Sequence, residues 1–412
     1  MICPRRPARR SSLVPAALAG LGVLAGCAAG SAPAPAPAPD ASGGATQSAA
    51  ASCPAAASGK WTAAQPASPA SGNNDLTSVA VLSPGNAWAV GSDAGTSGGQ
   101  ALAEHWNGTA WSVVPSPDPG DGGNFLTGIS AVSPSAIWAV GEYESAGQSK
   151  TLITAWNGTA WKQVPSPSPG LDNYLTGVWA VSADDVWAVG DYDNGPPGGS
   201  SLILHWNGRR WAQVPSPDPG FRNQLYAVTA TSAASAWAVG SSGSQQAASP
   251  FILHWNGTAW TRVAAPHLTG TGGELLGVDA TSAENVWAAG DVTDSAGEHT
   301  LTLHWNGTAW TRVPSPSPDG PDIVDSLRGV AATSAASAWA AGYISNGASY
   351  QPLILRWNGT AWTRAASPSP GAGGNLAGIA ASSPASAWAV GQFGAVGGDD
   401  AFAVRYCARA SG

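Results

Sequence analysis

Tryptophan recurs along this chain at a fixed interval, and this periodicity limits the fold more than any other feature. Two motifs, Trp-Ala-(Val/Ala)-Gly and Trp-Asn-Gly-x-x-Trp, alternate and each returns about every 50 residues, a period typical of propeller blades and solenoid repeats. The first motif begins at Trp88, Trp138, Trp187, Trp237, Trp287, Trp339 and Trp388. The second supplies the pairs Trp106 and Trp111, Trp156 and Trp161, Trp206 and Trp211, Trp255 and Trp260, Trp305 and Trp310, and Trp357 and Trp362.

Each repeat has the pattern of four short β-strands. In the second repeat we expect them at residues 126–133, 136–142, 151–156 and 159–165. The Asn-Gly dipeptide before the last strand favours a two-residue hairpin, which in the first repeat pairs Trp106 with Thr109. No segment shows a helical period. Seven such repeats predict an all-β protein, a seven-bladed β-propeller with four antiparallel strands per blade.

The repeats begin and end out of phase with the chain. Residues 60–66 match a fourth strand without a blade before it, and residues 402–406 match a third strand without a hairpin after it. We therefore expect the N-terminal strand to complete the last blade, within a propeller domain of residues 53–407 and a tail of residues 408–412. Cys53 and Cys407 fall at this junction, which predicts a disulfide; the alternative is two free thiols.

The N-terminus has the features of an export signal. Arg5, Arg6, Arg9 and Arg10 precede an apolar run at residues 13–26 that is too short to span a bilayer. The run ends in Leu-Ala-Gly-Cys at residues 24–27, which resembles the lipobox of bacterial lipoproteins. This resemblance implies that residues 1–26 are a signal peptide, that Cys27 is lipidated, and that the domain is anchored outside the cytoplasm to the bacterial cell membrane. An ordinary signal peptide with an incidental cysteine is the alternative. Residues 27–52, rich in Ala, Pro and Ser, would be a disordered tether.

The charge of the chain excludes some partners. Charged residues make up only 10% of the chain, and the net charge is −8. Removal of the signal peptide removes four arginines and makes the chain more acidic. Without a basic stripe, this balance argues against nucleic acid and against electrostatic docking to anionic lipid. We expect a monomer.

The recurring Trp and His residues have structural interpretations. Both hairpin tryptophans lie on one strand face, so we expect them to pack between blades; exposed sugar-binding rings are the alternative. His105, His205, His254 and His304 occur once per blade and therefore do not form a metal site. We expect them to cap a neighbouring strand or to face solvent, and we expect no cofactor.

The hairpin segment also resembles known propeller repeats. Leu-x-x-x-Trp-Asn-Gly-x-x-Trp-x-x-Val-Pro is similar to the last two strands of a kelch repeat. The hairpin resembles the Asp-box of sialidase-type propellers and the repeats of Ycf48-like assembly factors, with Asn in place of the box Asp. The resemblance implies the propeller fold and no particular activity.

Candidate binding residues come from the first strand of each repeat. The residue after its first Leu is small or apolar in most repeats, but Tyr226 and Arg328 break this trend, with Glu274 nearby. We expect these three residues to contribute to a ligand site, beside variable loops on one face, and we find no catalytic set. The sequence thus favours a non-catalytic binding or scaffold protein for an envelope protein or a wall polysaccharide. An envelope-complex assembly factor and a secreted carbohydrate-active enzyme are the alternatives.

Overall fold

The structure, a computed structural model, describes residues 53, 59–67, 73–93, 98–195, 198–244, 247–295, 297–318, 323–369, 373–395 and 398–408. The predicted signal peptide, Cys27 and the tether lie outside the described residues, as do residues 409–412 of the tail. The described residues form β-strands only, and they contain no helix that could span a membrane.

The strands repeat in groups of four, and each group is named here by its first strand. The first strands are β2 (Asn74–Ser83), β6 (Asn124–Ser133), β10 (Asp172–Ser182), β14 (Asn223–Ser232), β18 (Gly272–Ser282), β22 (Val324–Ser334) and β26 (Gly374–Ser383). The second strands are β3 (Asn86–Asp93), β7 (Ala136–Ser145), β11 (Asp185–Asp193), β15 (Ser235–Ser244), β19 (Asn285–Asp294), β23 (Ser337–Ser345) and β27 (Ser386–Ala395). The third strands are β4 (Gln100–Trp106), β8 (Gln148–Trp156), β12 (Ser200–Trp206), β16 (Ala247–Trp255), β20 (Gly297–Trp305), β24 (Tyr350–Trp357) and β28 (Gly398–Cys407). The fourth strands are β5 (Trp111–Val113), β9 (Trp161–Gln163), β13 (Trp211–Gln213), β17 (Trp260–Val263), β21 (Trp310–Arg312), β25 (Trp362–Ala365) and, from the other end of the chain, β1 (Lys60–Ala63).

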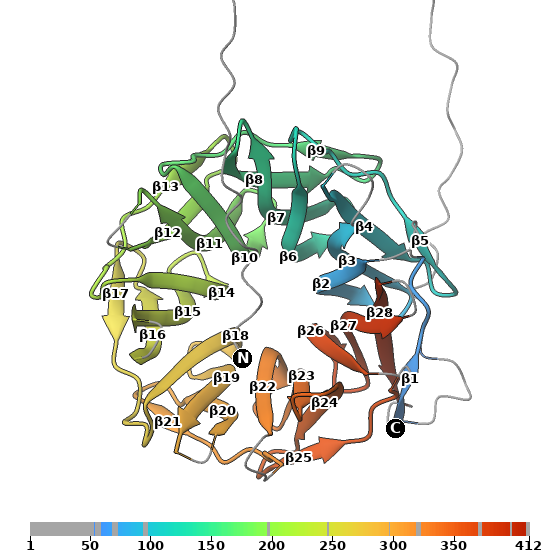
Figure 1. The fold of residues 1–412 in the computed structure, drawn as a ribbon, viewed down its shortest axis with the longest axis vertical. Helices are drawn as coiled ribbons and strands as arrows, with labels where there is room; N and C mark the ends of the chain where they lie inside the picture. Colours follow the sequence, from blue (N-terminus) through green and yellow to red (C-terminus); the bar gives the residue numbers. More distant parts are fainter. Residues whose placement is uncertain are drawn as a thin grey trace, which may run out of the picture. The chain divides into compact units, whose positions relative to one another are not determined.

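These groups form antiparallel sheets arranged like the blades of a propeller. Strands that are consecutive in the chain are paired within each unit, and in the β26 unit β1 also pairs with β28. The β18 and β22 units join through one parallel bridge between Glu298 and Val324. Figure 1 shows the sheets around a centre to which the first strands are closest. The prediction of an all-β, propeller-type fold is therefore confirmed. The fourth strands are shorter than the sequence pattern suggests.

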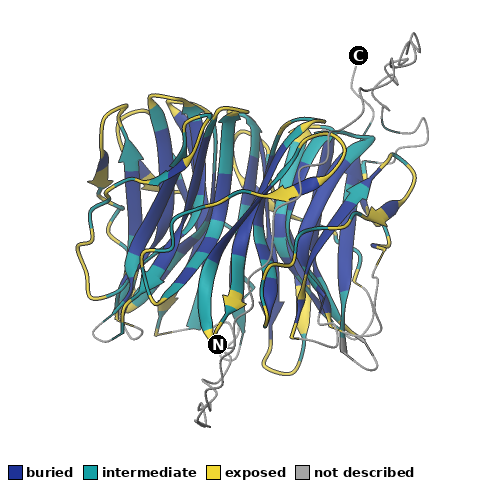
Figure 2. Ribbon diagram, turned by 90° about the horizontal axis from the view of Figure 1, so that it is seen from above, coloured by how far each residue is buried: buried dark blue, intermediate teal, exposed yellow. Residues whose placement is uncertain are grey.

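The antiparallel order gives the ring two different faces. The turns between first and second strands and the hairpin loops between third and fourth strands share one face, here called the turn face. The connections from second to third strands and from each fourth strand to the next unit share the other, here called the loop face. Figure 2 shows buried residues along the strands and exposed residues gathered at the turns and loops.

The Gly of each Trp-Ala-x-Gly motif allows close approach of the first strand. At Gly240, an added Cβ would lie 1.9 Å from the carbonyl oxygen of Gln224 on β14. The equivalent distance is 1.9 Å at Gly342 and 2.0 Å at Gly290. Since these contacts are with backbone, no side chain can be accommodated. The motif Gly is thus a packing requirement of the innermost strand pair.

The hairpin prediction is wrong in its register. Trp106 pairs directly with Trp111, not with Thr109, and the loop between them holds four residues. The Oδ1 atom of Asn107 accepts hydrogen bonds from the backbone N–H groups of Thr109, at 3.0 Å, and Ala110, at 3.1 Å. Gly108 alone in this loop has positive φ, of 101°. The asparagine side chain therefore organises a longer turn, and this also accounts for the Asn-Gly-Thr sequence.

The structure places the recurring tryptophans between neighbouring units. Trp187 on β11 is 1% exposed, and its ring centroid lies 5.0 Å from that of Trp255 and 5.2 Å from that of Trp260 in the next unit. The same arrangement joins Trp88 to Trp156 and Trp161, Trp138 to Trp206 and Trp211, Trp237 to Trp305 and Trp310, Trp287 to Trp357 and Trp362, and Trp388 to Trp106 and Trp111. These clusters form much of the core.

The histidines contact the first residue of the neighbouring strand, in line with the expected capping, and they also pack on a tryptophan. The Nε2 atoms of His105, His254 and His304 lie 3.0, 3.2 and 2.7 Å from side-chain oxygens of Asn86, Ser235 and Asn285. His205 stacks on Trp187 of its own unit, with ring centroids 4.1 Å apart, and its Nε2 atom lies 2.7 Å from the Asp185 carboxylate. His105 stacks likewise on Trp88, and the rings of His254 and His304 lie tilted over Trp237 and Trp287. In the β22 unit, Arg356 takes this place, 5.1 Å above the Trp339 ring. A flat or cationic group at this position thus covers a tryptophan face.

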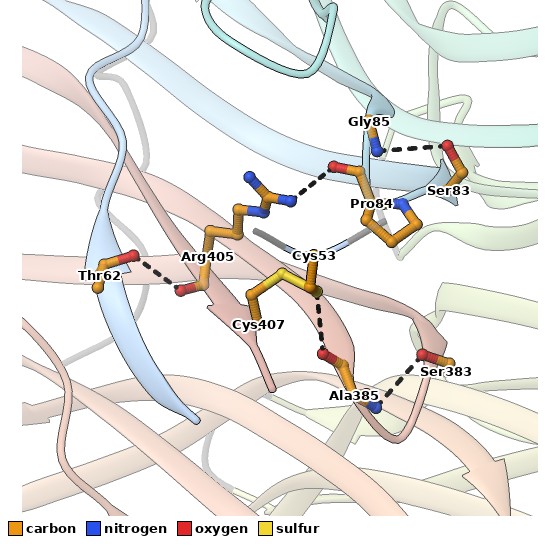
Figure 3. The surroundings of a disulfide bond; sticks show 9 residues. All are labelled: Cys53, Thr62, Ser83, Pro84, Gly85, Ser383, Ala385, Arg405 and Cys407. Atoms are coloured by element: carbon orange, nitrogen blue, oxygen red, sulfur yellow. Dashed lines mark hydrogen bonds between the residues drawn. A yellow bond between two sulfur atoms is a disulfide. The ribbon is translucent and has the colours of Figure 1, made fainter. Parts of the chain in front are cut away.

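The two ends of the chain meet in the β26 unit. Strand β1 pairs with β28, and Trp61 lies opposite Tyr406, as the repeat spacing predicts. The predicted disulfide between Cys53 and Cys407 is present, with its Cα atoms 5.7 Å apart and a sequence separation of 354 residues. Cys53 Sγ lies 3.6 Å from the Ala385 carbonyl oxygen, in the turn between β26 and β27, so the disulfide is at the turn face (Figure 3).

Candidate functional site at the loop-face end of the channel

Each first strand contains a β-bulge near the loop face. The strand pairing skips one residue there, for example Tyr226 between Leu225 and Ala227. The bulged residues are Thr77, Thr127, Thr176, Tyr226, Leu276, Arg328 and Ala377, and all of them line a central cavity of about 300 Å³. A bulge re-aims a side chain relative to a regular strand. The bulges thus direct one residue from each unit toward the channel.

The bulged residues divide the channel into two sides. The hydroxyl of Thr77 donates to the Leu126 carbonyl at 2.8 Å, that of Thr127 to Leu175 at 2.6 Å, and that of Thr176 to Leu225 at 2.7 Å. Each threonine thereby joins its unit to the next. On the other side, Tyr226, Leu276 and Arg328 extend larger side chains from three consecutive first strands. This side of the channel therefore offers a phenol, an aliphatic group and a guanidinium, whereas the other side offers threonines.

Tyr226 belongs to a polar network on β14 and β15. Its hydroxyl lies 3.2 Å from both Gln224 Oε1 and Ser241 Oγ. Gln224 in turn donates to Asp191 Oδ2 of the preceding unit at 3.3 Å. Burial, reinforced by the charge of Glu274, raises the pKa of Tyr226 above its ordinary value. The phenol is therefore neutral at physiological pH and serves as a hydrogen-bonding group.

Arg328 is held over a second tyrosine. Its Nη2 atom donates to the Tyr343 hydroxyl at 3.0 Å, and its Cζ atom lies 5.2 Å from the centroid of the Tyr343 ring. Burial by itself lowers the pKa of Arg328, but Tyr343, Asp291 and Glu274 outweigh this effect and raise it. The guanidinium is thus permanently charged and kept in place from one side, while the residue lines the channel with its remaining donors.

Acidic side chains surround this arginine. Glu274 on β18 pairs across the strands with Asp291 on β19, and Asp291 accepts a hydrogen bond from the Ser326 hydroxyl at 2.7 Å. Burial raises the pKa of Glu274, against the effect of Arg328 and Tyr226. Burial also raises the pKa of Asp291, and the charges of Glu274 and Glu298 raise it further. Carboxyl groups crowded in this way exchange protons near neutral pH more readily than exposed ones.

The structure brings together the three residues that the sequence singled out. Tyr226, Glu274 and Arg328 come from adjacent first strands, and their charges and hydrogen bonds influence one another. Sequence reasoning missed Asp291 and Tyr343. Both directly follow the Gly of a Trp-Ala-x-Gly motif, and this position also holds Asp191 and Ser241. Their shared position, directly after the motif Gly, is the sequence feature from which they could have been predicted.

This arrangement places donors and acceptors side by side at the end of a channel. Arg328 offers N–H groups, Glu274 offers carboxylate oxygens, and Tyr226 offers a hydroxyl, which together suit a polar ligand. Within the described ranges, no three His, Cys, Asp or Glu side chains are arranged to hold a metal ion. Parts of the predicted variable loops, including residues 94–97, 196–197 and 245–246, lie outside the described residues.

Comparison with known proteins relates the fold, and only the fold, to other propellers. The sequence matches no protein-family model and no curated protein. A structure described as YCF48 bound to D1 peptide aligns with a TM-score of 0.55 and 16% identity, over 88% of this chain and 99% of that chain. The GH74 xyloglucanase from Xanthomonas campestris aligns with a TM-score of 0.52 and 16% identity, over 80% of this chain. This chain spans 53% of that enzyme's length.

Proposed function

We propose that this protein is a non-catalytic binding or scaffold protein that engages its ligand at the loop face. The convergence of Tyr226, Glu274 and Arg328 at the loop-face end of the channel carries this proposal. Tyr226 is held by Gln224 and Ser241, and Arg328 is held by Tyr343, so both are positioned before a ligand arrives. Preorganised polar groups at the edge of a rigid scaffold favour specific binding.

We also propose a closed, seven-bladed propeller and a location outside the cytoplasm. The ring would be a monomer with seven blades, closed by β1; the packing of Trp388 on Trp106 and Trp111 supports this closure. The chain would be exported, cut before Cys27, lipidated there and tethered outside the cytoplasm by residues 27–52. The Cys53–Cys407 disulfide supports export, because such bonds persist in oxidising compartments.

The protonation state of Tyr226 argues against its use as a catalytic nucleophile. A nucleophilic tyrosine requires a lowered pKa, whereas burial raises the pKa of Tyr226. The Arg328 guanidinium already donates a hydrogen bond to the Tyr343 hydroxyl. We therefore propose that the site binds its ligand without chemical change.

An envelope-complex assembly factor is the second candidate. The YCF48 structure contains a D1 peptide, and the alignment covers nearly all of that chain. This likeness favours a protein ligand over a polysaccharide, and the role would then be to hold a segment of a membrane-protein partner during assembly.

The proposed function is tested by capture from envelope extracts and on a polysaccharide array with the full-length protein in detergent. The Arg328→Gln variant removes the charge in the channel, and Arg209→Gln, in an exposed hairpin on the turn face, is the matched control. We expect capture to be lost in the first variant and kept in the second, with unfolding curves verifying that both are folded. Equal capture by both variants would refute the site, and turnover of any glycan would refute the non-catalytic role.

A further inference from the structure

The two most exposed large apolar side chains among the described residues lie on either side of one loop-face connection. Phe221 is 63% exposed and Leu171 is 51% exposed. The Leu171 N–H donates to the Asp193 carbonyl at 2.9 Å, and a Cβ added at Gly198 would lie 1.9 Å from the Phe221 carbonyl oxygen. Both residues therefore flank the connection between β11 and β12.

The fold does not require apolar residues at these positions. Leu171 and Phe221 each follow a Pro-Ser-Pro-x-Pro-Gly segment, and the equivalent residue in the β6 unit is Asp121, which is exposed. Asp121 Oδ1 accepts a hydrogen bond from the Ala146 N–H at 3.2 Å, so a polar residue is well accommodated there. A large apolar side chain left in water forgoes the stabilisation that burial would give it. Two such residues around one connection therefore indicate a surface that is covered by a partner.

The surroundings of this pair determine which partner fits. Tyr192 lies against the same connection: a Cβ added at Gly170, the residue before Leu171, would be 3.0 Å from Cδ2 of Tyr192. Three half-buried or exposed aspartates, Asp172, Asp193 and Asp218, belong to the segments that carry these residues. Each accepts a backbone hydrogen bond through Oδ1, which leaves Oδ2 as a further acceptor. Arg222 is the only basic residue in these described segments, 170–174, 190–195 and 216–223. Leu171, Tyr192 and Phe221 with the three aspartates are called here the loop-face patch.

We propose that the loop-face patch binds an extended, positively charged segment of a partner protein, in which Lys or Arg alternates with apolar residues. Leu171, Tyr192 and Phe221 would contact the apolar side chains, while Asp172, Asp193 and Asp218 would pair with the cations. Aromatic and apolar residues within a ring of opposite charge give both affinity and orientation. Asp191, next to Tyr192 in the sequence, is joined through Gln224 to Tyr226 at the channel. This inference rests on the proposed function, since it names the partner of the same face.

The test uses a synthetic peptide in which Lys alternates with Leu and Ser, and the full-length protein in detergent. Two matched peptides carry Glu in place of Lys, or Ser in place of Leu. We expect only the Lys and Leu peptide to bind, with an affinity that falls at high ionic strength. Phe221→Ser and Leu171→Asp should each weaken binding about tenfold. The control Val132→Ser, at an apolar position 40% exposed beside the turn face, should leave binding unchanged.

Three results would overturn the inference: equal binding of the Glu peptide, no effect of Phe221→Ser, or a protein dimer that Phe221→Ser dissociates. The last result would assign the patch to a second copy of this chain. Capture from envelope extracts with Arg328→Gln is measured in parallel. If Arg328→Gln loses capture but the Lys peptide does not bind, the proposed function stands. Only the inference of a positively charged partner segment is then refuted.

Discussion

The turn half and the loop half of the ring use different aromatic residues. Every tryptophan lies in the turn half of its strand, where the rings fill the space between units. Every tyrosine except Tyr406 lies in the loop half, and Tyr226 and Tyr343 use their hydroxyls in the channel network. Indole rings maximise buried area, whereas phenols add a hydrogen-bonding group at the edge of a site. Under the proposed function, stability would depend mainly on the turn half and ligand recognition on the loop half.

The turn half and the loop half also differ in charge. Most described acidic residues lie at the loop-face ends of strands or in the connections there: Asp75, Asp93, Asp118, Asp121, Glu142, Glu144, Asp172, Asp191, Asp193, Asp218, Glu274, Asp291, Asp294, Glu298, Asp325, Asp399 and Asp400. Basic residues such as Arg209, Arg356 and Arg405 lie in the turn half. The net charge of the chain averages over two unlike surfaces. The loop face is therefore far more acidic than the net charge of the chain indicates.

The largest expected effect comes from the turn half. Trp237→Ala removes a ring that is 1% exposed and lies 4.9 Å from Trp305 and 5.3 Å from Trp310. We expect the free energy of unfolding to fall by about 3–5 kcal/mol in denaturant titrations, while binding at the loop face by the remaining folded protein is unchanged. Tyr174→Ala, in the loop half, is the matched control. An equal loss of stability in the control would break the division between the halves.

The disulfide should have the next largest effect. A Cys53→Ser, Cys407→Ser double variant removes the crosslink between the two ends of the chain. Since the closed loop is long, we expect a loss of about 2–4 kcal/mol in the free energy of unfolding. The thermal midpoint of the variant, compared with that of the wild type, measures this loss. An unchanged midpoint would show that the pairing of β1 with β28 suffices by itself.

The threonines of the channel should contribute less. Thr176→Val removes hydroxyl bonds to the Val189 and Leu225 carbonyls, of 3.1 and 2.7 Å, and should lower the free energy of unfolding by about 1 kcal/mol. The matched change Tyr226→Phe, at the same bulge position of the next unit, should alter ligand capture more than stability. If instead both variants changed only stability, the two sides of the channel would be equivalent and the comparison would need revision.

The smallest expected effect is on the pH dependence of stability, where His254 and Glu274 should act in opposite directions. Burial lowers the pKa of His254, so the unfolded chain binds the proton more tightly and acidification through the ordinary histidine range destabilises the fold. Burial raises the pKa of Glu274, so there the folded chain binds the proton more tightly and acidification stabilises the fold. His254→Gln should therefore reduce the fall of the thermal midpoint at acidic pH, whereas Glu274→Gln should make that fall larger. Shifts of the same sign in both variants would contradict this assignment.

Much of the fold could be predicted from the sequence because each unit must repeat the same packing. The Trp and Gly motifs identified the strands, and the phase of the repeats located the Cys53–Cys407 disulfide and the pairing of Trp61 with Tyr406. The hairpin register could not be predicted, because it depends on hydrogen bonds accepted by the Asn107 side chain.

The candidate site was predictable in part. Tyr226 and Arg328 stood out because they interrupt a column of small residues. Asp291 and Tyr343 did not, because their proximity to the channel depends on the bulges, which shift the register of the first strand against the second. The loop-face patch was missed because the residue after the repeated Pro-Ser-Pro-x-Pro-Gly segment differs between units, Asp121 in one and Leu171 and Phe221 in the others, so the repeat does not predict an exposed apolar pair.

The position of the disulfide has a mechanical consequence. Strand β1 is an outer strand held by one neighbour through residues 60–63, and a pull on its N-terminal end would peel it from β28 one bond pair at a time. Cys53 precedes β1, so tension on the chain before it passes through the sulfur atoms to Cys407 before β1 bears any load. Strand β28 is paired on both sides, with β1 and β27, and resists extraction. A pull on the chain N-terminal to Cys53 would therefore strain a covalent bond and an interior strand, and the outer strand β1 would carry no load.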